Sequence, residues 1–241
     1  MGKMLVEGLA NDSEATLVGG VDKYADSSKF DVPVFKTGSD INIKVDALID
    51  FSRAEALDEI LDYALKNKVA AVICTTGYSD AQLNQINEAS KIIPIFRSSN
   101  MSLGVNLLID LCRKASQVLK DDCDIEIIEQ HHNQKVDAPS GTAVSIANAI
   151  NEEYENNKEF VYGRHETNKK REKKEIGIHA VRGGTIVGKH DVMFIAQDEI
   201  ITIAHEAQSR AVFAKGAIRA AKFIAGLKPG MYNMQDLVKS L

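Results

Sequence analysis

The sequence has few cysteines, no excess of positive charge and no long hydrophobic segment. Its three cysteines, Cys74, Cys112 and Cys123, are odd in number and far apart, which fits reduced thiols better than a disulfide framework. The net charge is −5 with no basic stripe, so a nucleic-acid-binding surface is not indicated. No apolar segment is long enough to span a membrane, and the N-terminus lacks a signal-peptide core. We therefore expect a cytoplasmic protein.

Metal-binding patterns are also scarce. The neighbouring histidines His131 and His132 would point to opposite faces of an extended chain, so they do not converge on one ion. No cysteine pair flanks them, and a helical His-x3-His pattern is absent. The lysine-rich residues 169–175 include glutamates and are predicted to form a solvated loop. We predict no metal site and no phosphate-binding arm.

The first half of the chain alternates between strand and helix patterns. Strands are predicted at 45–51, 69–74 and 92–96, and helices at 54–66 and 80–91. The second of these strands is entirely apolar, as expected for a parallel sheet that is covered on both faces. The alternation predicts an α/β fold with a doubly wound, Rossmann-like parallel sheet.

The N-terminal residues carry a weaker cofactor signal. Residues 1–6 have a helical pattern, and a strand is predicted over 15–21, ending at Asp22. Asp22 lies 20 residues after Gly2, the distance at which an acidic residue binds the adenine ribose in dinucleotide-binding units. Lys23 could bind a 2′-phosphate as a point cation. Asp22 and Lys23 are therefore candidate cofactor-binding residues.

Small polar residues follow two of the predicted parallel strands. Ligands of such sheets bind beyond the carboxyl ends of the strands, where small side chains allow close approach of a nicotinamide and its ribose. Ordinary strand–helix loops would have a similar composition, so both interpretations remain open. The candidate cofactor-binding residues at these ends are Cys74, Thr75, Thr76, Ser98, Ser99, Asn100 and Met101.

The second half of the chain has a different pattern. Strands with short Gly or Asp turns between them predict a mainly antiparallel sheet, and hence a second α+β domain. Residues 155–175 are polar and are expected to form a mobile loop. The predicted strands are 125–128, 176–182, 185–187, 191–195 and 199–205, and the predicted helices are 102–119, 141–154 and 212–227.

Residues 129–143 combine several reactive groups. His131 and His132 follow an apolar strand, and Lys135 can return toward the same place. Ser140 is a good helix N-cap, and Gly141 and Thr142 would present backbone N–H groups at the helix start. Such a helix end favours an anion, and imidazoles beside it can move a proton. A polar loop with a capped helix is the simpler alternative for any one of these residues.

The same segment resembles a known family. Its pattern Glu-x-His-His-x-x-Lys-x-Asp-Ala-Pro-Ser-Gly-Thr-Ala is similar to the signature of 4-hydroxy-tetrahydrodipicolinate reductases, also called dihydrodipicolinate reductases. The resemblance extends over almost the whole chain. It implies NADH- or NADPH-dependent reduction of 4-hydroxy-tetrahydrodipicolinate to tetrahydrodipicolinate in lysine and diaminopimelate biosynthesis, by a homotetramer. It also implies a dinucleotide-binding domain at 1–102 and 213–241 and a substrate-binding and oligomerisation domain at 103–212.

The resemblance also implies roles for individual residues. His131 is the expected general acid/base and Lys135 a second proton donor, although the division between them stays open. His132, Gly141 and Thr142 are expected to bind the cyclic dicarboxylate substrate, and Arg210 to reach one of its carboxylates. The remaining histidines are predicted to be structural: His165, His179, His190 and His205.

The chain departs from the family pattern at its start. The family opens with a strand and Gly-x-x-Gly-x-Met-Gly, whereas this sequence begins in a way that matches only the last Met-Gly. Two alternatives therefore remain: a cofactor-deficient remnant that binds a dicarboxylate without turnover, or another NAD-linked imine reductase on the same scaffold. The choice between NADH and NADPH is also open.

Overall fold

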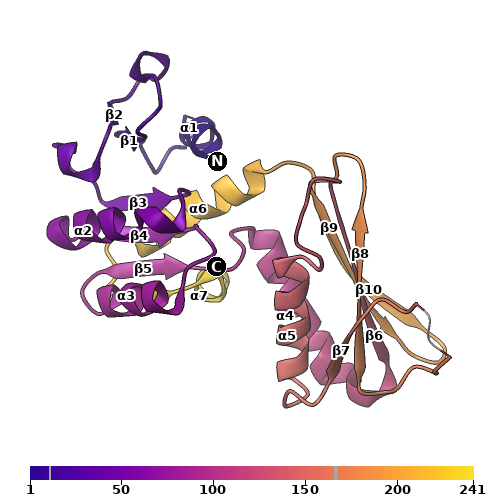
Figure 1. Ribbon diagram of the computed structural model, residues 1–241. Coiled ribbons are helices and arrows are strands. Elements are labelled where there is room, and N and C mark those ends of the chain that lie inside the picture. Colours follow the sequence, from indigo (N-terminus) through magenta and orange to yellow (C-terminus); the bar gives the residue numbers. More distant parts are fainter. Residues whose placement is uncertain (11, 166–167) are drawn as a thin grey trace. The chain divides into compact units, whose positions relative to one another are not determined.

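The computed structural model describes residues 1–10, 12–165 and 168–241. The chain divides into two compact units (Figure 1). Unit 1 consists of Met1–Ser102 and Ala211–Leu241, and unit 2 of Leu103–Arg210. No helix in the described ranges is both long and apolar enough to cross a membrane.

Unit 1 contains a four-stranded parallel sheet in the order β11-β5-β4-β3. A separate pair, β1 and β2, forms a second small sheet. The strands are β1 (Gly20–Val21), β2 (Val34–Phe35), β3 (Ala47–Asp50), β4 (Ala70–Ile73), β5 (Pro94–Arg97) and β11 (Gly230–Tyr232). The helices are α1 (Gly2–Leu9), α2 (Leu57–Asn67), α3 (Asp80–Ser90), α6 (Ala211–Ile224) and α7 (Met234–Lys239).

Helices cover both faces of the four-stranded sheet. On one face, apolar side chains of α2 and α3, including Leu61 and Ile86, form a buried cluster with Ile73 of β4. On the other face α6 contacts β3, β4 and β5, and the rings of Phe96 and Phe223 meet edge to face with centroids 6.3 Å apart. Because successive side chains of a strand point to opposite faces, an all-apolar strand such as β4 can serve both layers. The doubly wound fold predicted from the sequence is confirmed.

The strand predicted over residues 15–21 is much shorter in the structure. Only Gly20 and Val21 form a strand, and they pair with β2 rather than with the four-stranded sheet. The ladder is bounded by the hydrogen bonds from Gly20 N to Pro33 O and from Asp22 N to Phe35 O, each 3.0 Å. An extended pattern becomes a strand only where another backbone offers hydrogen bonds, and the sequence pattern does not contain that information.

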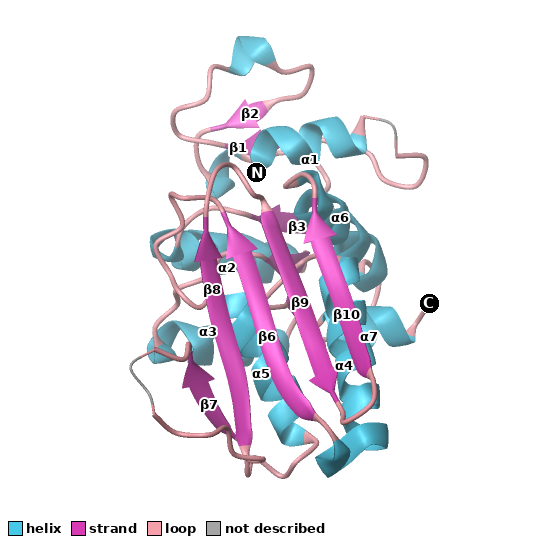
Figure 2. Cartoon of the chain, turned by 90° about the vertical axis from the view of Figure 1, so that its right-hand side faces the viewer, coloured by secondary structure: helices cyan, strands magenta, loops and turns pink. Residues whose placement is uncertain are grey.

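Unit 2 is a five-stranded sheet in the order β10-β9-β6-β8-β7, with α4 and α5 packed on one face (Figure 2). The strands are β6 (Asp124–His131), β7 (Glu159–Tyr162), β8 (Glu175–Arg182), β9 (Gly188–Ile195) and β10 (Ile200–Ala207). The helices are α4 (Leu103–Leu119) and α5 (Gly141–Glu152).

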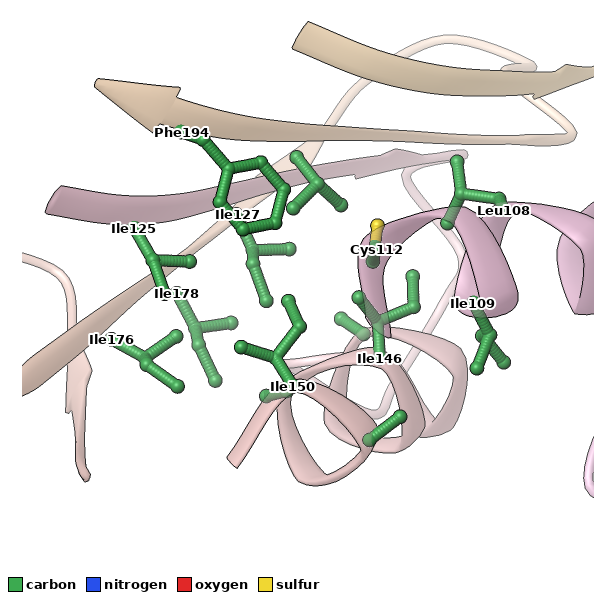
Figure 3. Packing of buried hydrophobic residues seen from close by; sticks show 14 of the residues in the cluster. Leu108, Ile109, Cys112, Ile125, Ile127, Ile146, Ile150, Ile176, Ile178 and Phe194 are labelled. Carbon is green, nitrogen blue, oxygen red and sulfur yellow. The ribbon is translucent and has the colours of Figure 1, made fainter. Parts of the chain in front are cut away.

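The central strand β6 alternates strictly between the helix-covered face and the opposite face. Its inward side chains Ile125 and Ile127 lie in the cluster that also holds Ile146 and Ile150 of α5 and Phe194 of β9 (Figure 3). Burial of each such side chain contributes about 1.5–3 kcal/mol relative to exposure. The same alternation places the last two inward positions of β6 at Glu129 and His131.

Three expectations for unit 2 need correction. The sheet is mixed rather than mainly antiparallel, because β8 runs parallel to both β6 and β7. The residues expected to form a mobile loop at 155–175 contain β7, which the sequence hides because it is short and half exposed. This expected loop also included Glu166 and Thr167, which lie outside the described residues. Residues 185–187 precede β9 and do not form a strand.

Candidate active site

His131 and Glu129 form a buried pair at the carboxyl end of β6. Glu129 is completely buried and His131 is 8% exposed. Nδ1 of His131 lies 2.6 Å from Oε2 of Glu129. A carboxylate can only accept, so the shared hydrogen belongs to Nδ1, and Nε2 is left to meet a ligand. Burial lowers the pKa of His131 despite the opposing effect of Glu129, so the free imidazole is neutral near pH 7.

Glu129 is the centre of a larger network. Arg182 of β8 donates from Nη2 to Oε1 at 2.7 Å and from Nη1 to Oε2 at 2.8 Å. The backbone N–H of Ser140 donates to Oε1 at 2.9 Å. Burial would raise the pKa of Glu129, but the hydrogen bonds from Arg182, His131 and Ser140 outweigh it and lower the pKa. Glu129 is therefore held as an ionised carboxylate.

The N-terminus of α5 adjoins this pair. Ser140 is the N-cap, and its Oγ accepts a hydrogen bond from the N–H of Ala143 at 3.2 Å, as the sequence predicted. A Cβ placed on Gly141 would meet no heavy atom within 4 Å beyond its chain neighbours and the backbone of its own helix. Because the helix end carries partial positive charge, it suits an anion, and the carboxylate of Asp137 accepts a hydrogen bond from the Gly141 N–H there.

His190 belongs to the same cluster, although the sequence indicated only a structural histidine. Its Nε2 lies 3.1 Å from Ser140 Oγ, and its ring meets that of His131 edge on, with centroids 5.3 Å apart. Burial lowers the pKa of His190 to about 4, so it is neutral. The signal that could have found it is the strand register, in which Glu129 on β6 pairs with His190 on β9. A single sequence does not contain that register.

Lys135 and His132 lie on the turn that follows β6. The N–H of Lys135 donates to the carbonyl of His132 at 3.1 Å, which turns the chain back. Nζ of Lys135 donates to Oδ1 of Asp137 at 2.7 Å, and this contact lowers the pKa of Asp137. The positive charge of Lys135 adds to the burial that lowers the pKa of His131. Arg210 is exposed at the end of unit 2.

Family models and sequence relatives of one family match nearly the whole chain. The family models described as dihydrodipicolinate reductase, N-terminus, and dihydrodipicolinate reductase, C-terminus, match residues 1–101 and 104–238. The chain belongs to the dihydrodipicolinate reductase family. A 4-hydroxy-tetrahydrodipicolinate reductase of Caldanaerobacter subterraneus subsp. tengcongensis is 52% identical over 239 residues, covering 99% of this chain and 94% of the relative. One of Clostridium novyi is 48% identical over 240 residues, covering 100% and 94%.

A solved structure of a dihydrodipicolinate reductase is also similar to this chain. A dipicolinate-bound dihydrodipicolinate reductase from Paenisporosarcina sp. TG-14 has a TM-score of 0.80 at 26% identity, covering 100% of this chain and 95% of that one. Membership in the dihydrodipicolinate reductase family confirms the reductase activity with NADH or NADPH and the place in lysine and diaminopimelate biosynthesis predicted from the sequence. The alternatives of a cofactor-deficient remnant and of another imine reductase are not favoured.

Unit 1 of this reductase has a hollow where its cofactor is expected. The hollow has a volume of about 420 Å³ and lies at the carboxyl ends of β3 and β4. Small and polar side chains in its wall fit close approach of a nicotinamide and its ribose. Burial, together with Asp50, raises the pKa of Cys74, so its thiol is protonated and is no nucleophile. The lining residues are Phe51, Ser52, Arg53, Ala54, Glu55, Cys74, Thr75, Thr76 and Gly77.

The other predicted cofactor residues lie elsewhere in unit 1. In the loop 98–101 after β5, Asn100 Oδ1 accepts from the N–H of Ser102 at 2.8 Å, and Met101 is 4% exposed. The side chain of Met101 therefore belongs to the core rather than to an open surface. Asp22 accepts hydrogen bonds from the N–H groups of Tyr24 and Ala25, and Lys23 lies 3.6 Å from Glu59. Their role toward the cofactor stays a prediction.

No group of three or more His, Cys, Asp or Glu side chains within the described ranges is arranged to hold a metal ion. Of the two neighbouring histidines, His131 already uses its Nδ1 in the contact with Glu129.

Ser140→Ala should destabilise unit 2 more than an ordinary cap mutation. Loss of the N-cap costs about 1 kcal/mol, and the buried His190 would lose its hydrogen-bonding partner, which costs about 1–3 kcal/mol more. Ser79→Ala is the matched control, because Ser79 caps α3 on the surface of unit 1. Urea denaturation of both variants measures the difference. Equal losses of stability would show that the contact with His190 contributes nothing.

Proposed function

We propose that unit 2 binds the cyclic dicarboxylate at the N-terminus of α5, with His131 and Lys135 as the proton-transferring residues. The single observation that carries this proposal is the His131–Glu129 pair beside the capped start of α5. The solved relative with dipicolinate bound supports a ring dicarboxylate as ligand. The domain boundaries are those expected from the sequence. The substrate-binding domain comprises residues 103–212, and the dinucleotide-binding domain comprises residues 1–102 and 213–241.

The two carboxylates of the substrate are proposed to bind to positive groups of unit 2. Gly141 and Thr142 at the start of α5 are proposed to bind one carboxylate, aided by the helix dipole, with the substrate replacing the carboxylate of Asp137 at the Gly141 N–H. His132 and Lys135 approach from the turn after β6. Arg210 is proposed for the other carboxylate, since a guanidinium can bind it through two parallel hydrogen bonds.

Conversion of 4-hydroxy-tetrahydrodipicolinate to tetrahydrodipicolinate releases the 4-hydroxyl group as water, which gives the conjugated ring. Reduction of that ring then needs one hydride and one proton. When bound, the reduced nicotinamide supplies the hydride. His131 supplies the proton from Nε2, because Nδ1 is occupied by Glu129. The free imidazole is neutral, so it must first take up a proton, and Lys135 serves as the second donor.

Dicarboxylate binding is therefore expected to take up protons near pH 7. Burial keeps the pKa of free His131 below its ordinary value of about 6.5, while two bound carboxylates favour the imidazolium and raise that pKa. Uptake should be largest between the free and bound pKa values and vanish well above both. Calorimetric titration with pyridine-2,6-dicarboxylate in two buffers of different ionisation enthalpy measures it. His131→Gln is the control, and the same uptake in that variant would contradict the assignment.

Unit 1 is proposed to bind the dinucleotide along the carboxyl ends of β3, β4 and β5. Cys74, Thr75 and Thr76 line the hollow there and would approach the nicotinamide. Residues 98–100 follow β5 at the same edge, and Met101 supports them from the core. Asp22 is proposed for the adenine ribose and Lys23 for a 2′-phosphate. Separate titrations with NADH and NADPH test this, because Lys23→Ala should weaken NADPH binding alone.

We also propose a cytoplasmic homotetramer assembled through unit 2. Exposed apolar side chains on β8 and β10 support an interface there: Val181, Ile200 and Ile201 are 44%, 62% and 39% exposed. Light scattering of the purified chain gives the number of subunits.

The overall test of function is turnover. Loss of the near-ultraviolet absorbance of NADPH or NADH should require the cyclic dicarboxylate substrate and should be inhibited by pyridine-2,6-dicarboxylate. Oxidation of the cofactor without the substrate, or none with it, would contradict the proposal.

A further inference from the structure

We propose that Glu129 is a positioning residue that fixes the tautomer of His131 and the place of the α5 N-terminus at once. The inference rests on the proposed function and deepens it. One oxygen of the carboxylate, Oε2, lies 2.6 Å from His131 Nδ1. The other, Oε1, accepts from the Ser140 N–H at 2.9 Å. The proton-transferring ring and the carboxylate-binding helix end are thus joined through one side chain.

The carboxylate has no freedom to change these roles. Glu129 is 0% exposed, and Arg182 donates one hydrogen bond to each of its oxygens. Each oxygen therefore accepts two hydrogen bonds, one from Arg182 and one from the group that it positions. An ionised carboxylate cannot donate, so the hydrogen on Nδ1 of His131 is fixed and Nε2 is the atom that exchanges protons.

The surroundings of His131 make this carboxylate decisive. Lys135 and Arg182 disfavour its imidazolium form, whereas Glu129 favours it. His190 packs edge on against the ring, and Asp137 engages Lys135. Gly188 of β9 leaves room beside Nε2, since a Cβ there would lie 3.0 Å from that atom. Without Glu129, the imidazolium, which is the form that can deliver a proton from Nε2, would lose the group that favours it.

The test is Glu129→Gln, which changes one oxygen into an NH₂ group. If the remaining oxygen keeps the Ser140 N–H, the NH₂ faces His131 and can only donate, so the neutral ring must turn to the Nε2–H tautomer. Nitrogen-15 NMR of the imidazoles distinguishes the two tautomers, with His131→Gln identifying the signals. We expect the Nδ1–H tautomer in the unchanged protein and its loss in Glu129→Gln. We also expect kcat to fall about 10²-fold, with KM nearly unchanged.

Glu126→Gln is the matched control. Glu126 lies on the same strand and also binds two arginines and a histidine, Arg164, Arg171 and His179, but on the opposite face of the sheet. It should leave the tautomer of His131 and kcat unchanged. If Glu129→Gln does not fold, Glu129→Asp withdraws the carboxylate from Nδ1 and should give the same two changes.

Two results separate this inference from the proposed function. An unchanged His131 tautomer with unchanged kcat, in Glu129→Gln or in Glu129→Asp, overturns the positioning role of Glu129 even when His131→Gln is inactive. Full activity of His131→Gln instead overturns the proposed role of His131 itself. The positioning role of Glu129 is then overturned too, because it acts through His131.

Discussion

His131→Gln is expected to lower kcat by about 10²–10⁴-fold while changing the affinity for the dicarboxylate far less. The glutamine amide fills part of the space of the imidazole but does not exchange a proton near neutral pH. The carboxylate-binding groups at the start of α5 remain, because Ser140 keeps its hydrogen bonds to Glu129 and Ala143. Steady-state kinetics gives kcat, and titration with pyridine-2,6-dicarboxylate gives the affinity.

The chain offers a control of the same chemistry for this variant. His179 lies 2.7 Å from a carboxylate oxygen of Glu126, on the face of the sheet opposite His131. His179→Gln removes an equivalent His–Glu pair from unit 2 without touching the proposed site. It should retain kcat, and if both variants keep full turnover, His131 has no part in the reaction.

Lys135→Ala is expected to raise KM and to lower kcat together. A charge-assisted hydrogen bond to a carboxylate is worth about 1.5–3 kcal/mol, which corresponds to about a 10–100-fold rise in KM. The lost proton donor should lower kcat by at least about tenfold. Steady-state kinetics over a range of substrate concentrations separates the two constants.

Lys189→Ala is the control for charge and pairing. Nζ of Lys189 lies 3.3 Å from Asp191 on the face of β9 that points away from α5, so it resembles the Lys135–Asp137 pair without lying at the site. If Lys135→Ala lowers only the melting temperature, as a structural residue would, its proposed role in proton transfer and binding is wrong.

The sequence predicted the parts of the fold that depend on neighbours along the chain. The apolar run of β4 identified a doubly covered sheet, and the helix cap at Ser140 followed from local hydrogen-bonding chemistry. His131 and Lys135 were found because they stand close together in the sequence. The short strands β2 and β7 were missed, because they exist only through backbone partners distant in the sequence.

The same limit applies to the site. Arg182 pairs with His131 in the register between β6 and β8, and His190 pairs with Glu129 in the register between β6 and β9. Arg182 ended a predicted strand and His190 directly preceded another, yet nothing along the chain aligns them with the end of β6. Strand register is a property of the folded sheet, so these partners became visible only in three dimensions.

The strict alternation of β6 has a consequence for insertions and deletions. Ile125, Ile127, Glu129 and His131 all face α5, whereas Glu126 faces the arginines on the other side. Gain or loss of one residue before Glu129 would turn the proton-transferring pair outward and bring residues of the other face into the core. Because this strand carries both the hydrophobic core and the reactive groups, length variation during divergence should be confined to the loops around it, while β6 keeps its length.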